Sequence, residues 1–110
     1  MRDDIRWIAG MLEGEGSFCW NMYLRSDRKG RRYSQAVISM QSTDADVVAR
    51  VAKFFKQLPQ GPYFWARGHQ PVYNVQLRGI PALRMMRRLY PYMGARRKAT
   101  IKWALQARSY

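Results

Sequence analysis

The segment Trp7-Ile8-Ala9-Gly10-Met11-Leu12-Glu13-Gly14-Glu15-Gly16-Ser17-Phe18 decides the fold of this chain. It begins with apolar residues at helical spacing and ends on two carboxylates separated by one glycine. It then runs directly into alternating apolar and polar residues, the pattern of a strand. A carboxylate at the end of a helix, beside a glycine-rich turn, is well placed to hold a divalent metal ion.

The composition indicates one strongly basic, folded domain, residues 1–110. Lys and Arg number 20 against 7 Asp and Glu, a formal net charge of +13, and 47% of the residues are hydrophobic. Such an excess of positive charge implies an acidic partner, which is most often nucleic acid; a membrane surface is the alternative.

Other features of the sequence indicate an intracellular protein. No run of about 18 apolar residues could form a spanning helix, and Arg2, Asp3 and Asp4 open the chain without a secretory signal pattern. The single Cys19 excludes an internal disulfide, and with one histidine it cannot supply a cysteine-based zinc site. We therefore expect no membrane and no small-molecule cofactor among the partners.

Residues 4–14 are expected to form a helix with two apolar stripes. The first stripe is Ile5, Ile8, Ala9 and Leu12, and the second is Trp7, Gly10, Met11 and Gly14. A surface helix needs only one such stripe, so this helix is either fully buried in a monomer or packed against a second helix. Glycines four apart let two backbones approach closely, and symmetric self-association is common. We therefore predict a homodimer through the second stripe.

Two hairpins are expected after the first helix. Residues 18–25 and 35–41 alternate apolar and polar side chains around the polar turn 26–32, and strands 63–67 and 72–78 are joined through Gly68-His69-Gln70-Pro71. In the second strand the alternation sets Ala36, Ile38 and Met40 against Gln35, Val37, Ser39 and Gln41.

Between the hairpins, Thr43 and Asp46 resemble a capping box. The helix that follows is expected to carry an apolar stripe from Val47 to Leu58 and to end at Pro59-Gln60-Gly61-Pro62.

Two more helices are expected, one beginning at Pro81 and one covering about 95–107. The first of them carries Arg84, Arg87 and Arg88 outward. The order of elements predicts an α+β fold: one four-stranded antiparallel sheet with helices on one face and the other face open.

The open face of the predicted sheet contains no carboxylate, whereas a solvated sheet face normally mixes Lys and Glu. Arg suits guanine edges, and Asn and Gln suit adenine edges, so DNA readout is favoured over a solvated face. Trp65 belongs to this face or to the core, and His69, in a predicted turn, is expected to contact phosphate or solvent. The residues predicted to bind DNA are Asn21, Tyr23, Arg25, Arg28, Lys29, Arg31, Arg32, Gln35, Ser39, Gln41, Trp65, Arg67, His69, Asn74, Gln76 and Arg78.

The acids of Glu13-Gly14-Glu15 stand at a helix end, where the helix dipole disfavours anions. The pair is therefore destabilising unless a cation compensates it. Arg or Lys could do so, and so could Mg²⁺, which takes oxygen ligands and keeps several waters. A structural salt bridge and a metal site stay open as alternatives.

The segment Ile8 to Gly16 resembles the nine-residue motif of the LAGLIDADG homing endonucleases, and the order of elements is similar to one core domain of that family. The resemblance implies that the motif helices of two domains pack together and that their acids bind a divalent metal, Mg²⁺, over the minor groove of DNA. Glu15 matches the metal-binding acid, with Glu13 and Gly14 beside it. Family members commonly carry Asp where Glu15 stands.

The resemblance also suggests further positions of the reaction site. Gln41 or Asp44 would match a polar residue that holds the nucleophilic water, although Asp44 could equally be a helix cap. Arg96, and secondly Lys98, would match the basic residue that stabilises the reacting phosphate; the alternative is that this basic run only binds backbone phosphate.

The activity implied by the resemblance is that of a homing endonuclease, an enzyme class of mobile introns. A chain with one motif would act as a homodimer that cuts a long, near-palindromic site on both strands by metal-dependent hydrolysis. The alternatives are a non-cleaving DNA-binding regulator or an RNA-binding splicing helper on the same scaffold, or a basic protein of the ribosome or a membrane surface.

Overall fold

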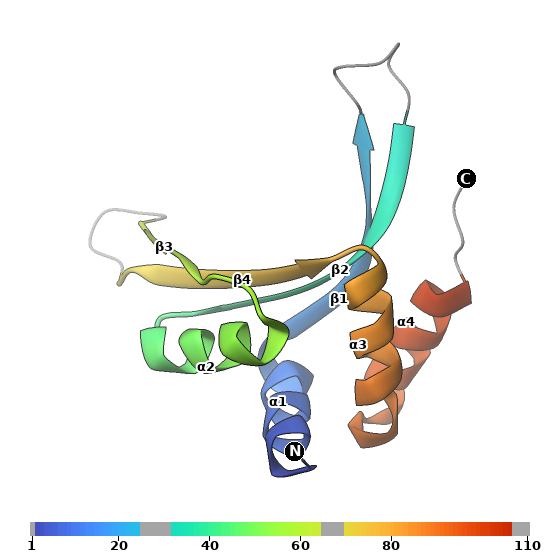
Figure 1. Ribbon diagram of the computed structural model, residues 1–110, viewed down its shortest axis with the longest axis horizontal. Helices are drawn as coiled ribbons and strands as arrows, with labels where there is room; N and C mark the ends of the chain where they lie inside the picture. The colour runs from blue at the N-terminus through green and yellow to red at the C-terminus, as the bar shows by residue number, and fades with distance from the viewer. Residues whose placement is uncertain (1, 25–31, 65–69, 107–110) are drawn as a thin grey trace.

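The computed structural model describes the backbone of residues 2–24, 32–64 and 70–106. In chain order these form α1 (Arg2–Glu15), β1 (Gly16–Leu24), β2 (Arg32–Ser42), α2 (Ala45–Phe55), β3 (Gln60–Tyr63), β4 (Val72–Arg78), α3 (Ile80–Leu89), a 3₁₀ turn (Tyr90–Tyr92) and α4 (Ala95–Gln106). The strands pair antiparallel in the order β1-β2-β4-β3. Figure 1 shows the α-helices together on one side of this sheet, so the predicted α+β architecture is confirmed.

One apolar core lies between the sheet and the helices. Every buried side chain of the described residues is apolar, so hydrophobic burial supplies the driving force that holds the layers together. The largest fully buried side chains come from α1, α2, α3, α4 and the inner strands: Ile8, Leu12, Ile38, Met40, Val48, Val51, Val75, Met86, Leu89 and Ile101.

α1 confirms the helix predicted over residues 4–14 and extends it at both ends. The first predicted stripe is buried, as Ile5, Ile8, Ala9 and Leu12 all lie in the core. The chain then enters β1 without a loop, because Gly16 lies against the last turn of α1. A Cβ on Gly16 would stand 2.7 Å from the carbonyl oxygen of Leu12, so only glycine fits this close approach of backbone to backbone.

α2 corrects two predictions from the sequence. Its N-cap is Asp44 rather than Thr43, since the Asp44 carboxylate accepts the backbone N–H groups of Asp46 and Val47. The helix stops at Phe55, where Lys56 takes a left-handed conformation with φ 57°. Leu58 therefore falls outside the helix and is 85% exposed. The sequence predicts it on the apolar stripe because its spacing from Phe55 continues the helical period.

β3 also corrects the predicted hairpin. The strand is Gln60–Tyr63, so it begins inside the Pro59-Gln60-Gly61-Pro62 stretch that the sequence predicts as a helix stop, and Phe64 lies beyond its end. Gly61 is the reason: it has φ +120°, and a Cβ there would stand 2.8 Å from the carbonyl oxygen of Val72 in β4. The glycine is needed for strand pairing, not for a turn.

The last two helices agree with the predicted positions. Pro81 stands in the first turn of α3, whose Arg84, Arg87 and Arg88 are exposed as predicted. α4 lies against β1 and is joined to it by a hydrogen bond of 2.7 Å from the Trp20 indole to the Ala104 carbonyl. None of the helices among the described residues is both long and apolar enough to span a bilayer.

Candidate functional site

The open face of the sheet is built by the register of its strands. β2 pairs with β4 so that Ser39 faces Gln76 and Gln41 faces Asn74. Cross-strand partners point to the same face, and the alternate residues of both strands, such as Ile38 and Val75, fill the core. The predicted polar positions Gln35, Ser39, Gln41, Asn74, Gln76 and Arg78 therefore share one surface.

Val37 corrects the expected pattern on this face. It alternates with Ile38, so it points away from the main core, yet it is only 1% exposed and faces Arg78 across the sheet. The β1 register sets Cys19 on its other side. The open face therefore has an apolar position at its centre, with polar groups towards both ends of β2.

Two polar side chains of the open face are joined by hydrogen bonds, and one buried polar atom there has no partner among the described residues. The guanidinium of Arg78 donates two hydrogen bonds to the side-chain oxygen of Gln76, one of them from Nε over 2.9 Å. The Oδ1 atom of Asn74 is buried and accepts no hydrogen bond from the described part of the chain. No Asp or Glu occurs in the four strands. An anion approaching this surface thus meets donors and dipoles, with no carboxylate within the strands to repel it.

Several predicted DNA contacts cannot be compared with the structure. Asn21, Tyr23 and Arg32 occupy strand positions opposite Gln35, Tyr33 and Leu24, which places their backbones in the β1–β2 hairpin but says nothing of their side chains. The remaining predicted contacts lie outside the described residues and stay predictions: Arg25, Arg28, Lys29, Arg31, Trp65, Arg67 and His69.

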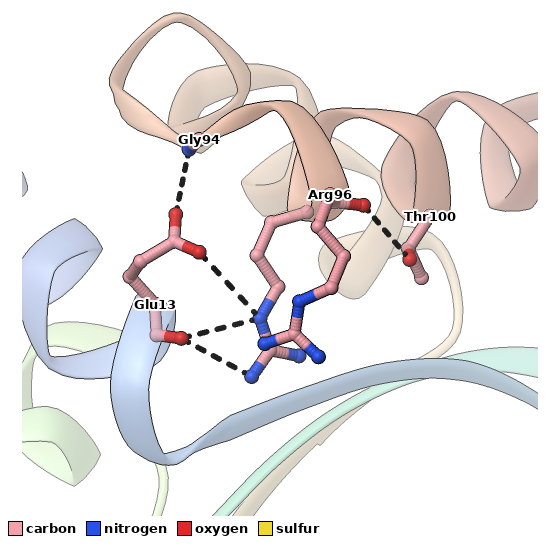
Figure 2. A network of polar contacts seen from close by, with 5 residues as sticks. Glu13, Gly94, Arg96 and Thr100 are labelled. Carbon is pink, nitrogen blue, oxygen red and sulfur yellow. Dashed lines mark hydrogen bonds and ion pairs between the residues drawn. The ribbon is translucent and has the colours of Figure 1, made fainter.

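Glu13 links the end of α1 to the start of α4 (Figure 2). Its carboxylate Oε1 accepts the backbone N–H of Gly94 over 2.6 Å, and its Oε2 lies 3.9 Å from Nε of Arg97. The Arg97 guanidinium also donates to the Glu13 carbonyl oxygen, over 3.3 Å from Nε and 3.2 Å from its second donor. The two helix ends are thus joined by four contacts.

These contacts form a reciprocal cap between two helices. The Glu13 carbonyl is one of the last in α1 and has no partner within the helix, and Arg97 supplies one. Gly94 is the N-cap of α4, since its carbonyl accepts the first helical bond, from Lys98 over 2.9 Å. Glu13 supplies the carboxylate that a capping box would place on the N-cap N–H. Each charge lies at the unfavourable end of its own helix dipole and at the favourable end of its partner's.

Glu15 differs from Glu13 in that its carboxylate is available. It is the last residue of α1, it is exposed, and no hydrogen bond or ion pair joins its side chain to another described residue. The sequence left a structural salt bridge and a metal site open for this pair of acids. In the structure Glu13 makes the salt bridge, and the exposed Glu15 carboxylate is available to a ligand.

The described residues of one chain do not enclose a metal ion. Residues 2–24, 32–64 and 70–106 contain no group of three His, Cys, Asp or Glu side chains able to hold one. One chain offers the Glu15 carboxylate and the carbonyl of Gly14 at the end of α1. Such a donor set fits a hard cation only when other oxygen ligands come from water, a phosphate or a second copy of the site.

The basic residues proposed for the reacting phosphate lie at the start of α4. Arg96 is exposed, and Figure 2 shows its side chain reaching from α4 towards the end of α1. The ammonium of Lys98 instead lies 5.5 Å from the ring centre of Tyr90. Arg97, for which the sequence predicts no role, is the residue that contacts Glu13. The available signal was its spacing, because Arg97 falls on the buried stripe of α4 with Ile101 and Ala104.

The two residues proposed to hold water differ in environment. Gln41 is exposed on the open face, near the end of β2. The Oδ1 atom of Asp44 accepts hydrogen bonds from Asp46 and Val47 over 3.0 and 3.3 Å. The helix-cap role of Asp44 is therefore present in the structure, whereas a chemical role stays a prediction.

The second stripe of α1 lies at the surface. Gly10 and Gly14 are exposed, and a Cβ at either would meet no atom within 4 Å. Trp7 and Met11 are half-buried, and the Arg50 guanidinium lies 3.8 Å from the Trp7 ring centre. Neither glycine is required by packing among the described residues, although each weakens the helix.

Comparison with known proteins gives a consistent result at the level of structure. No protein-family model and no curated protein matches the sequence. The fold matches the homing endonuclease I-CvuI in complex with a DNA target in the presence of Mg, with a TM-score of 0.71, 18% identity and 96% of this chain covered. It matches the archaeal intron-encoded homing endonuclease I-Vdi141I complexed with DNA, with a TM-score of 0.66, 14% identity and 91% of this chain covered.

A third structural match is the group I intron-encoded homing endonuclease I-CeuI complexed with DNA, with a TM-score of 0.66, 18% identity and 96% of this chain covered. The chain spans 65% of the I-CvuI chain, 64% of the I-Vdi141I chain and 55% of the I-CeuI chain. The fold that the motif predicted is confirmed: this chain has the fold of the LAGLIDADG homing endonucleases.

Proposed function

We propose that this protein is a site-specific DNA endonuclease that acts as a homodimer on a long, near-palindromic duplex. The observation that carries the proposal is the free Glu15 carboxylate at the exposed end of α1, in a chain whose sheet face carries no carboxylate. The Glu15 carboxylate has no partner among the described residues. A polyanion bound nearby would raise the concentration of cations around it.

DNA binding is assigned to the open face of the sheet. Gln41 and Asn74 stand side by side there, as do Ser39 and Gln76. Their amides and hydroxyls suit base edges, and Arg78 suits guanine or phosphate. The net charge of +13 supplies the long-range attraction to DNA and implies an affinity that falls steeply with salt. A DNA substrate also agrees with the intracellular location that we expect.

A divalent cation fits the end of α1, although the choice of Mg²⁺ belongs to the proposal. Glu15 and the Gly14 carbonyl would hold the ion together with water and a DNA phosphate. When bound there, it would supply Lewis-acid polarisation of the phosphate and an activated water. Arg96, exposed at the start of α4, would neutralise the reacting phosphate. Gln41 or Asp44, near the end of the sheet, would orient the attacking water.

The proposed homodimer is supported by the number of acids and by the two exposed glycines. Each chain provides one copy of the motif, whereas cutting both strands requires two. Gly10 and Gly14 leave a flat strip on α1 where a second α1 could pack backbone to backbone, with Trp7 and Met11 at its sides. A twofold axis through this strip would bring two copies of Glu15 together and match a palindromic site.

The decisive test compares Glu15→Gln with Asp46→Asn, a matched loss of one exposed carboxylate outside the site. Cleavage sites are first selected from a random duplex library with Mg²⁺. Glu15→Gln is expected to abolish cutting of the selected sites and to leave DNA binding intact, while Asp46→Asn cuts like the unaltered protein. Undiminished cutting by Glu15→Gln contradicts the proposed role. Tight duplex binding by the unaltered protein without cutting in any divalent ion would support the non-cleaving regulator instead.

A further inference from the structure

Arg97 lies close to residues that come before and after Glu15 in the sequence. Before Glu15, its guanidinium holds the carbonyl and the carboxylate of Glu13. After Glu15, the same guanidinium lies 5.7 Å from the ring centre of Phe18 in β1. The side chain of Arg97 is only 13% exposed, so it is held between α1, β1 and its own helix and is poorly placed to meet a substrate directly.

The turn that carries Glu15 is fixed at two further points. Gly16 is pressed against the last turn of α1, where a Cβ would stand 2.7 Å from the Leu12 carbonyl oxygen. Gly94 is close enough to Glu13 that a Cβ there would stand 3.3 Å from the carboxylate oxygen Oε1. The segment from residue 13 to residue 18 therefore has little room to shift relative to the start of α4.

The start of α4 also carries Arg96, the residue next to Arg97. Arg96 is exposed, whereas Arg97 points to the buried side, so the two neighbours have different surroundings. Figure 2 shows the Arg96 side chain beside the Glu13 network. Whatever holds α4 against α1 therefore also sets the position of Arg96 relative to Glu15.

We propose that Arg97 is a positioning residue: through the reciprocal cap with Glu13 and Gly94, it fixes the exposed carboxylate of Glu15 relative to the exposed guanidinium of Arg96. This inference rests on the proposed nuclease function for its effect on catalysis, but the cap itself does not. Residues that orient a metal ligand or a catalytic group through such contacts typically change activity by about 10- to 100-fold when removed.

The first experiment removes the cap. Arg97→Met keeps the apolar part of the side chain and loses the donors, and Arg87→Met removes an exposed cation from α3 as the matched control. Under single-turnover conditions with saturating DNA, Arg97→Met is expected to cut about tenfold more slowly or worse, with unchanged DNA affinity. Hydrogen exchange of the backbone amides of residues 13–18 is expected to accelerate in Arg97→Met and not in Arg87→Met.

The second experiment separates positioning from stability. In the double variant Glu13→Ala with Arg97→Glu, the new carboxylate occupies the third residue of α4 and can cap the Gly94 N–H from within its own helix. Thermal stability is then expected to be closer to that of the unaltered protein than the stability of Arg97→Met is. Cleavage stays slow because the contacts of the reciprocal cap no longer join the start of α4 to the end of α1. Cleavage that recovers together with stability overturns the proposal, because Arg97 then acts only on folding.

The outcomes also distinguish this inference from the proposed function. If the unaltered protein cuts no DNA, the nuclease proposal fails, and the exchange rates of residues 13–18 alone decide whether Arg97 holds the end of α1. If the unaltered protein cuts DNA and Arg97→Met cuts equally fast with unchanged exchange, the positioning role fails and the nuclease stands.

Discussion

The indole of Trp20 in β1 donates a hydrogen bond of 2.7 Å to the carbonyl of Ala104 in α4, across 84 residues of sequence. Ala104 lies near the C-terminal end of the described part of α4. The bond therefore joins this part of α4 to the edge strand of the sheet. Together with the cap at the start of α4, it holds this helix at both ends.

Trp20→Phe tests how much this hydrogen bond contributes to stability. The change keeps most of the apolar contact and deletes the donor, so we expect the free energy of unfolding to fall by about 1 kcal/mol. Urea denaturation measures it. Trp103→Phe is the matched control on the same helix, because Trp103 is 57% exposed and lies outside the apolar core. Equal effects of the two changes would show that the hydrogen bond contributes nothing.

Gly16→Ala tests the close approach at the end of α1. The added methyl group would stand 2.7 Å from the Leu12 carbonyl oxygen and 2.8 Å from its side chain. Since backbone must move to relieve this contact, we expect a loss of about 1–3 kcal/mol in unfolding free energy. Gly14→Ala, where a Cβ meets nothing within 4 Å, should cause no loss. A fully stable Gly16→Ala protein would mean that the turn can open without penalty.

Gly10→Ala tests the proposed dimer seam through opposite effects on folding and association. Alanine at this exposed helical position should stabilise the isolated fold by roughly 0.5–1 kcal/mol, because no described atom lies near the new Cβ. The same methyl group would hold two copies of α1 apart and weaken the dimer. Analytical ultracentrifugation of the free protein and of its DNA complex reports the association. A dimer of undiminished strength would place the seam elsewhere.

Asp44 provides a test that separates a helix cap from a chemical group. Asp44→Ala should lower the unfolding free energy by about 1 kcal/mol, since the N–H groups of Asp46 and Val47 lose their acceptor. Asp44→Ser restores a cap without a carboxylate and should recover most of that stability. Thermal melting and cleavage are compared for both variants. If Asp44→Ser is stable but does not cut, Asp44 takes part in the reaction as well as in the cap.

The parts of the fold that the sequence predicted are those with a clear period. The buried stripe of Ile5, Ile8, Ala9 and Leu12 and the alternation of Ile38 and Met40 followed from spacing, because each repeats over several turns or strand residues. The boundaries that failed are set by single backbone conformations. Lys56 ends α2 in the left-handed region, and Gly61 enters β3 with positive φ. Neither leaves a periodic signal.

The sequence predicted the two acids of the site but not the contacts that join Glu13 to α4. The motif located both acids, and the helix-dipole argument required a compensating cation. The identity of that cation could not be read from the sequence, because Arg97 and Glu13 are separated by 84 residues and Arg96 and Lys98 are equally basic neighbours. Only the packing of α4 against β1 selects Arg97, by turning it inward.

The reciprocal cap has a consequence for biosynthesis. Gly94 and Arg97 follow Glu13 by 81 and 84 residues, so α1 leaves the ribosome before its cap exists. The contacts that hold the end of α1 can form only once α4 has been translated. We therefore expect any cleavage that depends on Glu15 to begin only after α4 has folded onto the rest of the domain.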